Sequence, residues 1–131
     1  MTRINVVNPS ELSGPHLVAE YRELPRVFSL ARKAQHELHK KKIPQEYTLG
    51  TGHEVFFRDK LLYLAKRYER IHKECIKRGF NVHDYTFYKE QLPPLMADRL
   101  WRDWTPNKQA IDENVKRLYE RFFFKKECLP L

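Results

Sequence analysis

The chain has 131 residues, which is the usual length of one domain with one hydrophobic core, and its 41% hydrophobic residues exclude an intrinsically disordered protein. It contains 25 lysines and arginines against 17 acidic residues, and the resulting net charge of +8 favours a polyanionic partner such as nucleic acid. Because no apolar run has the length of a membrane span or signal peptide, we expect an intracellular, cytoplasmic protein with no membrane partner.

The N-terminal residues 1–12 are predicted to form a short extended arm followed by a turn. The arm carries Ile4, Val6 and Val7, and the sequence Asn8-Pro9-Ser10 is typical of a turn. Ser13 is then a suitable N-cap for a helix that begins near Pro15.

Two amphipathic helices follow the arm. The first is predicted from about Pro15 to about Lys40, with a kink near Tyr21 and Arg22 because Pro25 lies inside it. The second is predicted to end at Arg78-Gly79, with Gly79 as the residue that terminates the helix. Its apolar stripe consists of Phe57, Leu61, Leu64, Tyr68, Ile71 and Cys75.

The last part of the chain is predicted to contain a long loop and a third helix. Residues 80–106 include Pro93-Pro94 and show no sustained periodicity, which indicates loops and short turns packed by aromatic residues. The third helix should start near Asn107 and face inward with Ile111, Val115, Leu118 and Phe122. The expected fold is therefore all-α, a single domain over residues 1–131 with three main helices and, by default, a monomer.

A possible catalytic pair consists of Thr2 and Glu23. Removal of Met1 would expose the α-amine of Thr2, and an α-amine titrates near pH 7.7–8.0, so part of it is neutral and nucleophilic at physiological pH. Such an amine can form an imine with a deoxyribose, and a carboxylate such as Glu23 can assist β-elimination. From spacing alone, a frayed terminus and a surface glutamate remain the simpler interpretation.

Basic residues on two predicted helices are candidates for phosphate binding. Arg22 and Arg26 are four residues apart, as are Arg117 and Arg121, so each pair shares a helix face. The alternative is an ordinary solvated charged face. No metal site is indicated, because Phe57 interrupts the zinc-binding motif that His53-Glu54 would begin, and His53 is interpreted as the start of the second helix.

Several longer segments carry a resemblance to a known family. They are Met1–Asn5, Ala19–Phe28, Leu49–His53 and Glu74–Asn81, with weaker matches at Glu11-Leu12, His16-Leu17, Phe56-Phe57, Asp59–Leu61 and Arg117-Leu118. On these residues the sequence resembles the phage-type pyrimidine dimer DNA glycosylase family, also called endonuclease V, over most of the chain up to about Phe122.

The resemblance implies an all-helical domain whose N-terminal arm threads between helices and brings the terminal amine beside a glutamate. Thr2 would be the imine-forming nucleophile and Glu23 the catalytic carboxylate. Residues implied in binding DNA are Arg3, His16, Arg22, Arg26, Arg117 and Arg121. The implied function is that of a bifunctional glycosylase with abasic-site lyase activity on damaged double-stranded DNA, with no metal or organic cofactor. A protein with this function would be associated with the nucleoid when it acts.

Parts of the chain depart from the family. The position of Arg121 is lysine in the phage member, the segment 35–46 is shorter, and the segment 82–104 and the C-terminal tail match poorly. These departures leave the lesion open between pyrimidine dimers and related base damage. The alternative function is a non-catalytic, basic, helical DNA-binding module, which retention of Met1 would favour because no Thr2 amine would then exist.

Overall fold

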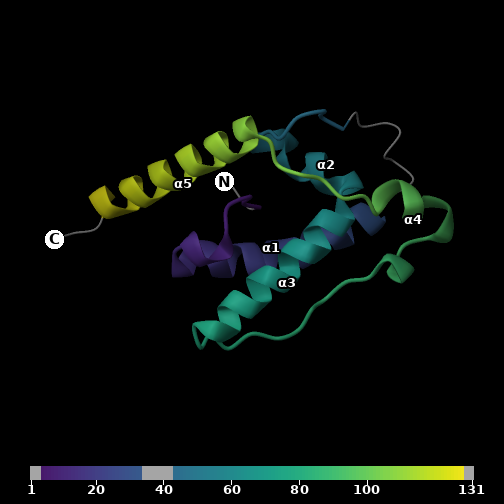
Figure 1. Cartoon of the computed structure of the whole chain (residues 1–131), viewed down its shortest axis with the longest axis horizontal. Coiled ribbons are helices and arrows are strands. Elements are labelled where there is room, and N and C mark those ends of the chain that lie inside the picture. Colours follow the sequence, from purple (N-terminus) through teal and green to yellow (C-terminus); the bar gives the residue numbers. More distant parts are fainter. Residues whose placement is uncertain (1–3, 34–42, 129–131) are drawn as a thin grey trace.

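The structure, a computed structural model, describes residues 4–33 and 43–128, with side chains as far as Glu120. Within these ranges it is helical and contains no strand, which confirms the predicted all-α class (Figure 1). The three main helices are α1 (Gly14–Lys33), α3 (Leu61–Lys77) and α5 (Lys108–Cys128), and two short helices are α2 (His53–Phe56) and α4 (Pro94–Leu100). None of the described helices combines the length and apolar character needed to cross a membrane.

Helices α1 and α3 pack against each other and form the centre of the core. The predicted apolar stripes are buried on both helices, including Leu24 of α1 and Leu64 of α3, each with no exposed surface. Helix α1 continues through Pro25 without a break, and its predicted extension to Lys40 lies outside the described residues. The second helix begins at Leu61 rather than at the first residue of its stripe, because residues 57–59 form a separate 3-10 turn.

The end of α3 agrees with the prediction. Gly79 has a φ of 80°, the left-handed conformation that glycine adopts without a steric penalty. Its N–H donates to the Ile76 carbonyl at 2.9 Å and the Phe80 N–H donates to the Cys75 carbonyl at 3.0 Å. These two hydrogen bonds form a Schellman motif, which closes the helix.

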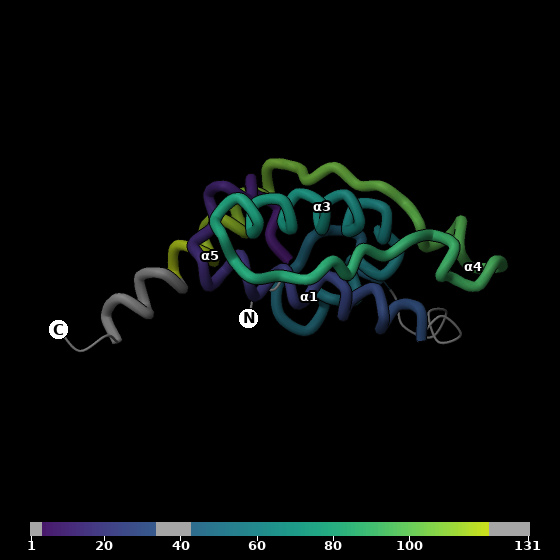
Figure 2. Tube along the Cα trace, turned by 90° about the horizontal axis from the view of Figure 1, so that it is seen from below, coloured from purple at the N-terminus to yellow at the C-terminus, as the bar shows by residue number. Residues whose placement is uncertain are grey.

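Residues 80–106 contain a helix that the sequence pattern did not predict. Helix α4 begins with Pro94 at its first helical position, where the missing N–H of proline costs nothing, so the two prolines begin a helix instead of excluding one. Before it, the segment 81–88 runs back along α1 and α3 (Figure 2). The Tyr21 hydroxyl donates to the His83 carbonyl at 2.7 Å, and the Phe87 ring stacks on Phe28 at 4.6 Å.

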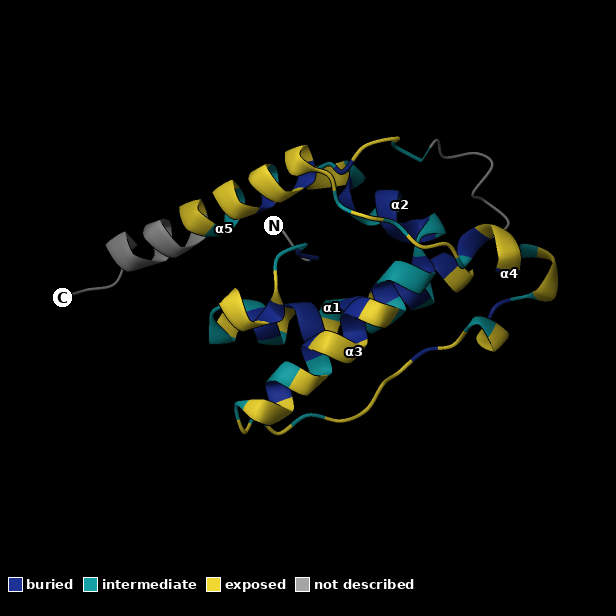
Figure 3. Ribbon diagram, in the orientation of Figure 1, coloured by how far each residue is buried: buried dark blue, intermediate teal, exposed yellow. Residues whose placement is uncertain are grey.

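Helix α5 starts where predicted but turns a different face inward. The Asn107 side chain accepts a hydrogen bond from the Ala110 N–H at 2.8 Å and so caps the first turn. Ala110 and Asn114 are fully buried, whereas Ile111 and Val115 are 39% and 47% exposed, so the predicted inner face is wrong by about one residue. In the part of α5 whose side chains are described, most residues are exposed to solvent (Figure 3). Of the other two predicted inward residues, Leu118 packs against the core and the Phe122 side chain lies outside the described residues.

A buried ion pair joins the two central helices. Glu20 of α1 and Arg67 of α3 have side chains that are 0% and 2% exposed. The guanidinium donates from Nε at 2.7 Å and from Nη2 at 3.1 Å to the two carboxylate oxygens, the bidentate geometry that orients such pairs best. Burial by itself lowers the pKa of Arg67, but the adjacent Glu20 carboxylate outweighs this and raises it.

Removing the cation of this pair should strongly destabilise the protein. In Arg67→Leu the Glu20 carboxylate stays buried without its partner, and we expect a loss of about 3–5 kcal/mol in the free energy of unfolding. The control is Lys66→Ala, which removes an ion pair to Asp103 between side chains that are 60% and 48% exposed and should cost less than about 1 kcal/mol. Urea unfolding followed by circular dichroism measures both, and equal effects would contradict the prediction.

Candidate active site

The N-terminal arm enters the core at Ile4, which is fully buried. Its backbone N–H donates to Nε2 of His53 at 3.1 Å, and its carbonyl accepts a hydrogen bond from the Tyr47 hydroxyl at 3.4 Å. Because Nε2 accepts, the ring proton lies on Nδ1, which donates to the Thr48 carbonyl at 2.9 Å. His53 begins the short helix α2 and not the predicted second helix, which is α3, and its ring also holds the arm.

The next three residues of the arm are bonded to three different helices. The Asn5 side chain donates to Glu20 of α1 at 2.9 Å and accepts from Asn114 of α5 at 2.8 Å. The Val6 N–H donates to Asn114 at 2.8 Å, and the Val7 carbonyl accepts from Arg67 of α3. The arm therefore threads between helices, as the resemblance implied.

The electrostatics around the arm keep His53 neutral. Burial of the ring lowers its pKa, while the hydrogen bond to the Thr48 carbonyl and the nearby carboxylates of Glu20 and Glu23 act in the opposite direction. The net direction is downward, so the ring stays an acceptor for the arm at neutral pH.

Glu23, the predicted catalytic carboxylate, lies one turn beyond Glu20 on the same side of α1. Three residues of helix place it about 4.5 Å further along the axis, on the side that faces the arm at Asn5. Its side chain is 12% exposed and pairs with Arg26 at 3.5 Å. Its proposed catalytic partner Thr2 and the predicted DNA-binding residue Arg3 lie outside the described residues.

The predicted DNA-binding residues of α1 lie on exposed parts of that helix. Arg22 is exposed, and the Arg26 side chain is 59% exposed. His16 lies in the first turn, where its Nδ1 is 2.9 Å from the Ser13 hydroxyl. These residues lie on one helix at two turns or less from Glu23.

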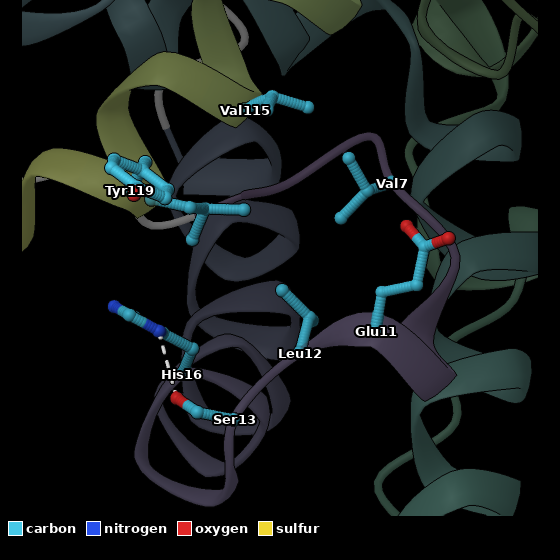
Figure 4. Close-up of a pocket in the computed structure, with 8 residues that line it drawn as sticks. Val7, Glu11, Leu12, Ser13, His16, Val115 and Tyr119 are labelled. Atoms are coloured by element: carbon cyan, nitrogen blue, oxygen red, sulfur yellow. Dashed lines mark hydrogen bonds between the residues drawn. The ribbon is translucent and has the colours of Figure 1, made fainter. Parts of the chain in front are cut away.

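His16 also borders a cavity of about 380 Å³ between the end of the arm and α5 (Figure 4). The cavity is mainly apolar, and its lining residues are Val7, Glu11, Leu12, Ser13, His16, Val115, Leu118 and Tyr119. In Figure 4 the His16 and Tyr119 side chains lie on the same side of the cavity. Helix α5 thus approaches the start of α1 at this point.

Arg117 lies on α5 beside the residues that line this cavity. Its Nε is buried and has no hydrogen-bond partner among the described residues. A buried donor without an acceptor lowers the stability of the fold. Arg121 lies one turn further along α5, and its side chain is outside the described part of the chain.

The sequence prediction missed the residues that hold the arm. These residues are Asn5, Glu20, Arg67 and Asn114. The hydrogen bond from the arm to His53 was also not predicted. A charged or amide residue on an apolar helix face, such as Glu20 or Asn114, was a signal that could have been noticed. It does not show which residue binds there, because the partners are 15 to 109 residues away in the sequence. Among the described residues, no three histidine, cysteine or acidic side chains gather as metal ligands.

A comparison with known protein families matches the part of the chain that contains the arm and helices α1, α2 and α3. The family model described as pyrimidine dimer DNA glycosylase matches residues 1–87, about two thirds of the chain. The match therefore includes the buried arm, Glu23 and the ion pair that supports both. The chain belongs to the pyrimidine dimer DNA glycosylase family and is a DNA repair glycosylase.

Proposed function

We propose that the protein is a bifunctional DNA glycosylase and abasic-site lyase whose nucleophile is the α-amine of Thr2 after removal of Met1. The observation that carries this proposal is the burial and hydrogen bonding of the arm at Ile4 and Asn5. A frayed terminus would leave its backbone N–H groups in water, whereas the Ile4 N–H is buried and donates to the neutral His53 ring. The substrate is double-stranded DNA with pyrimidine dimers or related base damage.

Chain geometry limits how far the proposed nucleophile can lie from this anchor. Thr2 is two residues before Ile4, so its nitrogen is within about 7 Å of the Ile4 nitrogen. The Ile4 nitrogen in turn is 3.1 Å from the His53 ring. The Glu23 carboxylate is among the charges that raise the pKa of His53, which supports a position of Glu23 on the side of α1 toward the arm.

The proposed reaction proceeds by substitution and then elimination. The neutral amine attacks C1′ of the damaged nucleotide, the glycosidic bond breaks, and the base leaves with one of the two amine protons. The second proton on nitrogen passes to O4′ as the C1′–O4′ bond breaks, which opens the sugar ring and gives an imine. Glu23 then accepts a proton from C2′, and the C3′–O bond breaks with the phosphate as leaving group. Water hydrolyses the remaining imine and restores the amine.

The arginines of α1 and α5 are proposed to bind the DNA backbone around this site. Arg22 and Arg26 are exposed beside Glu23, and Arg117 has a buried Nε that lacks a partner in the described part of the chain. Arg3, His16 and Arg121 complete the proposed contact set. Guanidinium groups suit this role because they bind phosphate oxygens in a bidentate manner.

Borohydride should trap the proposed imine. Wild-type protein with Met1 removed, verified by mass determination, should form a covalent complex with a duplex that contains an abasic site. Glu23→Gln should lower the rate of strand cleavage by about 10²–10⁴-fold, because it removes the proton acceptor. Glu69→Gln, an exposed glutamate on α3, is the matched control and should cleave at the wild-type rate.

Protein that retains Met1 should form the covalent complex much more slowly than the processed protein, because its terminal amine lies one residue further from the anchor at Ile4. Absence of trapping by the processed wild type would overturn the proposal. Salt-dependent DNA binding without strand cleavage would instead identify a non-catalytic DNA-binding module.

Loss of a phosphate contact should change the salt dependence of DNA binding. Arg26→Gln should weaken binding to damaged and undamaged duplexes alike and reduce the slope of log K against log salt by about 1. Arg70→Gln, an exposed arginine on α3, should leave the slope unchanged. Titrations between low and moderate salt, followed by fluorescence anisotropy, give the slope. Equal slopes for wild type and Arg26→Gln would exclude a phosphate contact.

Acidification should destabilise the folded protein through His53. Its pKa is lower in the folded state than the usual value near 6.5, so the unfolded state binds the proton first. The contribution of neutral His53 to the free energy of unfolding is fully present above about pH 6.5. It is lost as the pH falls below this value, by at most about 1.4 kcal/mol per pH unit.

Urea unfolding between pH 7.5 and pH 5 measures this slope. His53→Gln cannot titrate and should unfold with a smaller slope, whereas His83→Gln, which replaces an exposed histidine, should retain the wild-type slope. A slope that persists in His53→Gln would show that another group is responsible.

A further inference from the structure

We propose that Asn114 is a positioning residue for the N-terminal amine, because it joins the arm to the helix that carries Arg117. The inference rests on the proposed function for its catalytic part. Asn114 is fully buried, and among the described residues its side chain bonds to the arm: its amide donates to Asn5 and its oxygen accepts from Val6. It therefore acts through the arm and not on the DNA.

The hydrogen bonds that end at Asn114 have a fixed direction. An ionised Glu20 can only accept, so Asn5 turns its NH₂ toward Glu20 and its oxygen toward α5. Asn114 must then present its own NH₂ to that oxygen, which leaves its Oδ1 for the Val6 N–H. The buried charge on α1 thus determines the orientation of an amide on α5.

Asn114 occupies the central position of the stripe by which α5 packs on the core. Ala110 one turn before it is fully buried, and Leu118 one turn after it packs against the core. An apolar residue there could bury its surface without needing any partner. A buried amide stabilises only the arrangement that satisfies it, so Asn114 favours one register of α5 against the arm.

The position of Asn114 links two proposed parts of the site. Arg117 follows it by one turn of the same helix, about 4.5 Å along the axis. Asn5 follows Thr2 by three residues of the arm. A shift of α5 would therefore change the distance between the nucleophile and the phosphate-binding arginine, and a shift of about 1 Å can lower a rate on the order of 100-fold.

Two variants of full-length protein test this inference. Asn114→Leu keeps the branching at Cγ and removes both hydrogen bonds. Asn114→Asp keeps an acceptor for Val6 but turns an oxygen against the Asn5 oxygen. At saturating abasic-site DNA both should lower the rate of borohydride trapping by about 10- to 100-fold. Their Kd for a duplex with a non-reactive tetrahydrofuran site should stay within about threefold of wild type, because Asn114 does not contact the DNA.

Ala110→Gly is the matched control, since it weakens the docking of α5 by about 1 kcal/mol without removing a hydrogen bond to the arm. It should trap at close to the wild-type rate. Wild-type trapping rates in both Asn114 variants would overturn the inference. An equal loss in Ala110→Gly would also overturn it, since helix docking alone would then explain the effect.

Amide hydrogen exchange provides a readout that needs no catalysis. The Val6 amide should exchange on the order of tenfold faster in Asn114→Leu, while the Leu17 amide of α1, bonded to the Ser13 carbonyl at 2.9 Å, should not change. Unchanged exchange at Val6 would overturn the role of Asn114 as an anchor. Absence of trapping in wild type would overturn the proposed function, and the exchange at Val6 would still decide whether Asn114 holds the arm.

Discussion

The buried carboxylate of Glu20 is the constraint on which the rest of the structure depends. A charge with no exposed surface must be neutralised and fully hydrogen-bonded, and Arg67 and Asn5 meet this need from α3 and from the arm. One side chain of α1 thereby fixes the position of two other elements. Arg67 reaches further, to the Val7 carbonyl, so the two members of the ion pair hold the arm at Asn5 and at Val7. The arm belongs to the core even though it has no regular secondary structure.

This constraint separates two carboxylates that lie one turn apart on α1. Glu20 is enclosed, and both of its oxygens accept hydrogen bonds from side chains of the protein. Glu23 retains 12% exposure and an ion pair with an arginine that is largely in solvent, an interaction that contributes little to stability. The environments of the two carboxylates therefore differ, with Glu20 enclosed and Glu23 partly exposed. Under the proposed function, an arm fixed at Asn5 by Glu20 would limit how far the terminal amine can move from α1, which is the preorganisation that catalysis needs.

The sequence was most informative where local rules decide the structure. The periodicities of α1 and α3, the terminating Gly79 and the start of α5 near Asn107 depend on neighbours within one or two turns, and all were predicted. Helix α4 was missed because its seven residues are too few for a periodic pattern. The inner face of α5 was misplaced because an apolar pattern points to Ile111 and Val115, whereas the hydrogen bonds of Asn114 turn the helix the other way. Partners such as Glu20 and Arg67, 47 residues apart, leave no periodic signal in a single sequence.

The same network determines how the end of the chain relates to the family match. The match covers residues 1–87, so α4 and α5 lie beyond it. Yet α5 satisfies the Val6 N–H and the Asn5 oxygen, and without it two polar groups of the matched arm would lose their partners. Each such group costs on the order of 1–3 kcal/mol when buried and unpaired. Helix α5 therefore supplies hydrogen-bond partners to an arm that lies within the family match. Substitutions in α5 at residues that do not contact DNA should change the position of the N-terminal arm.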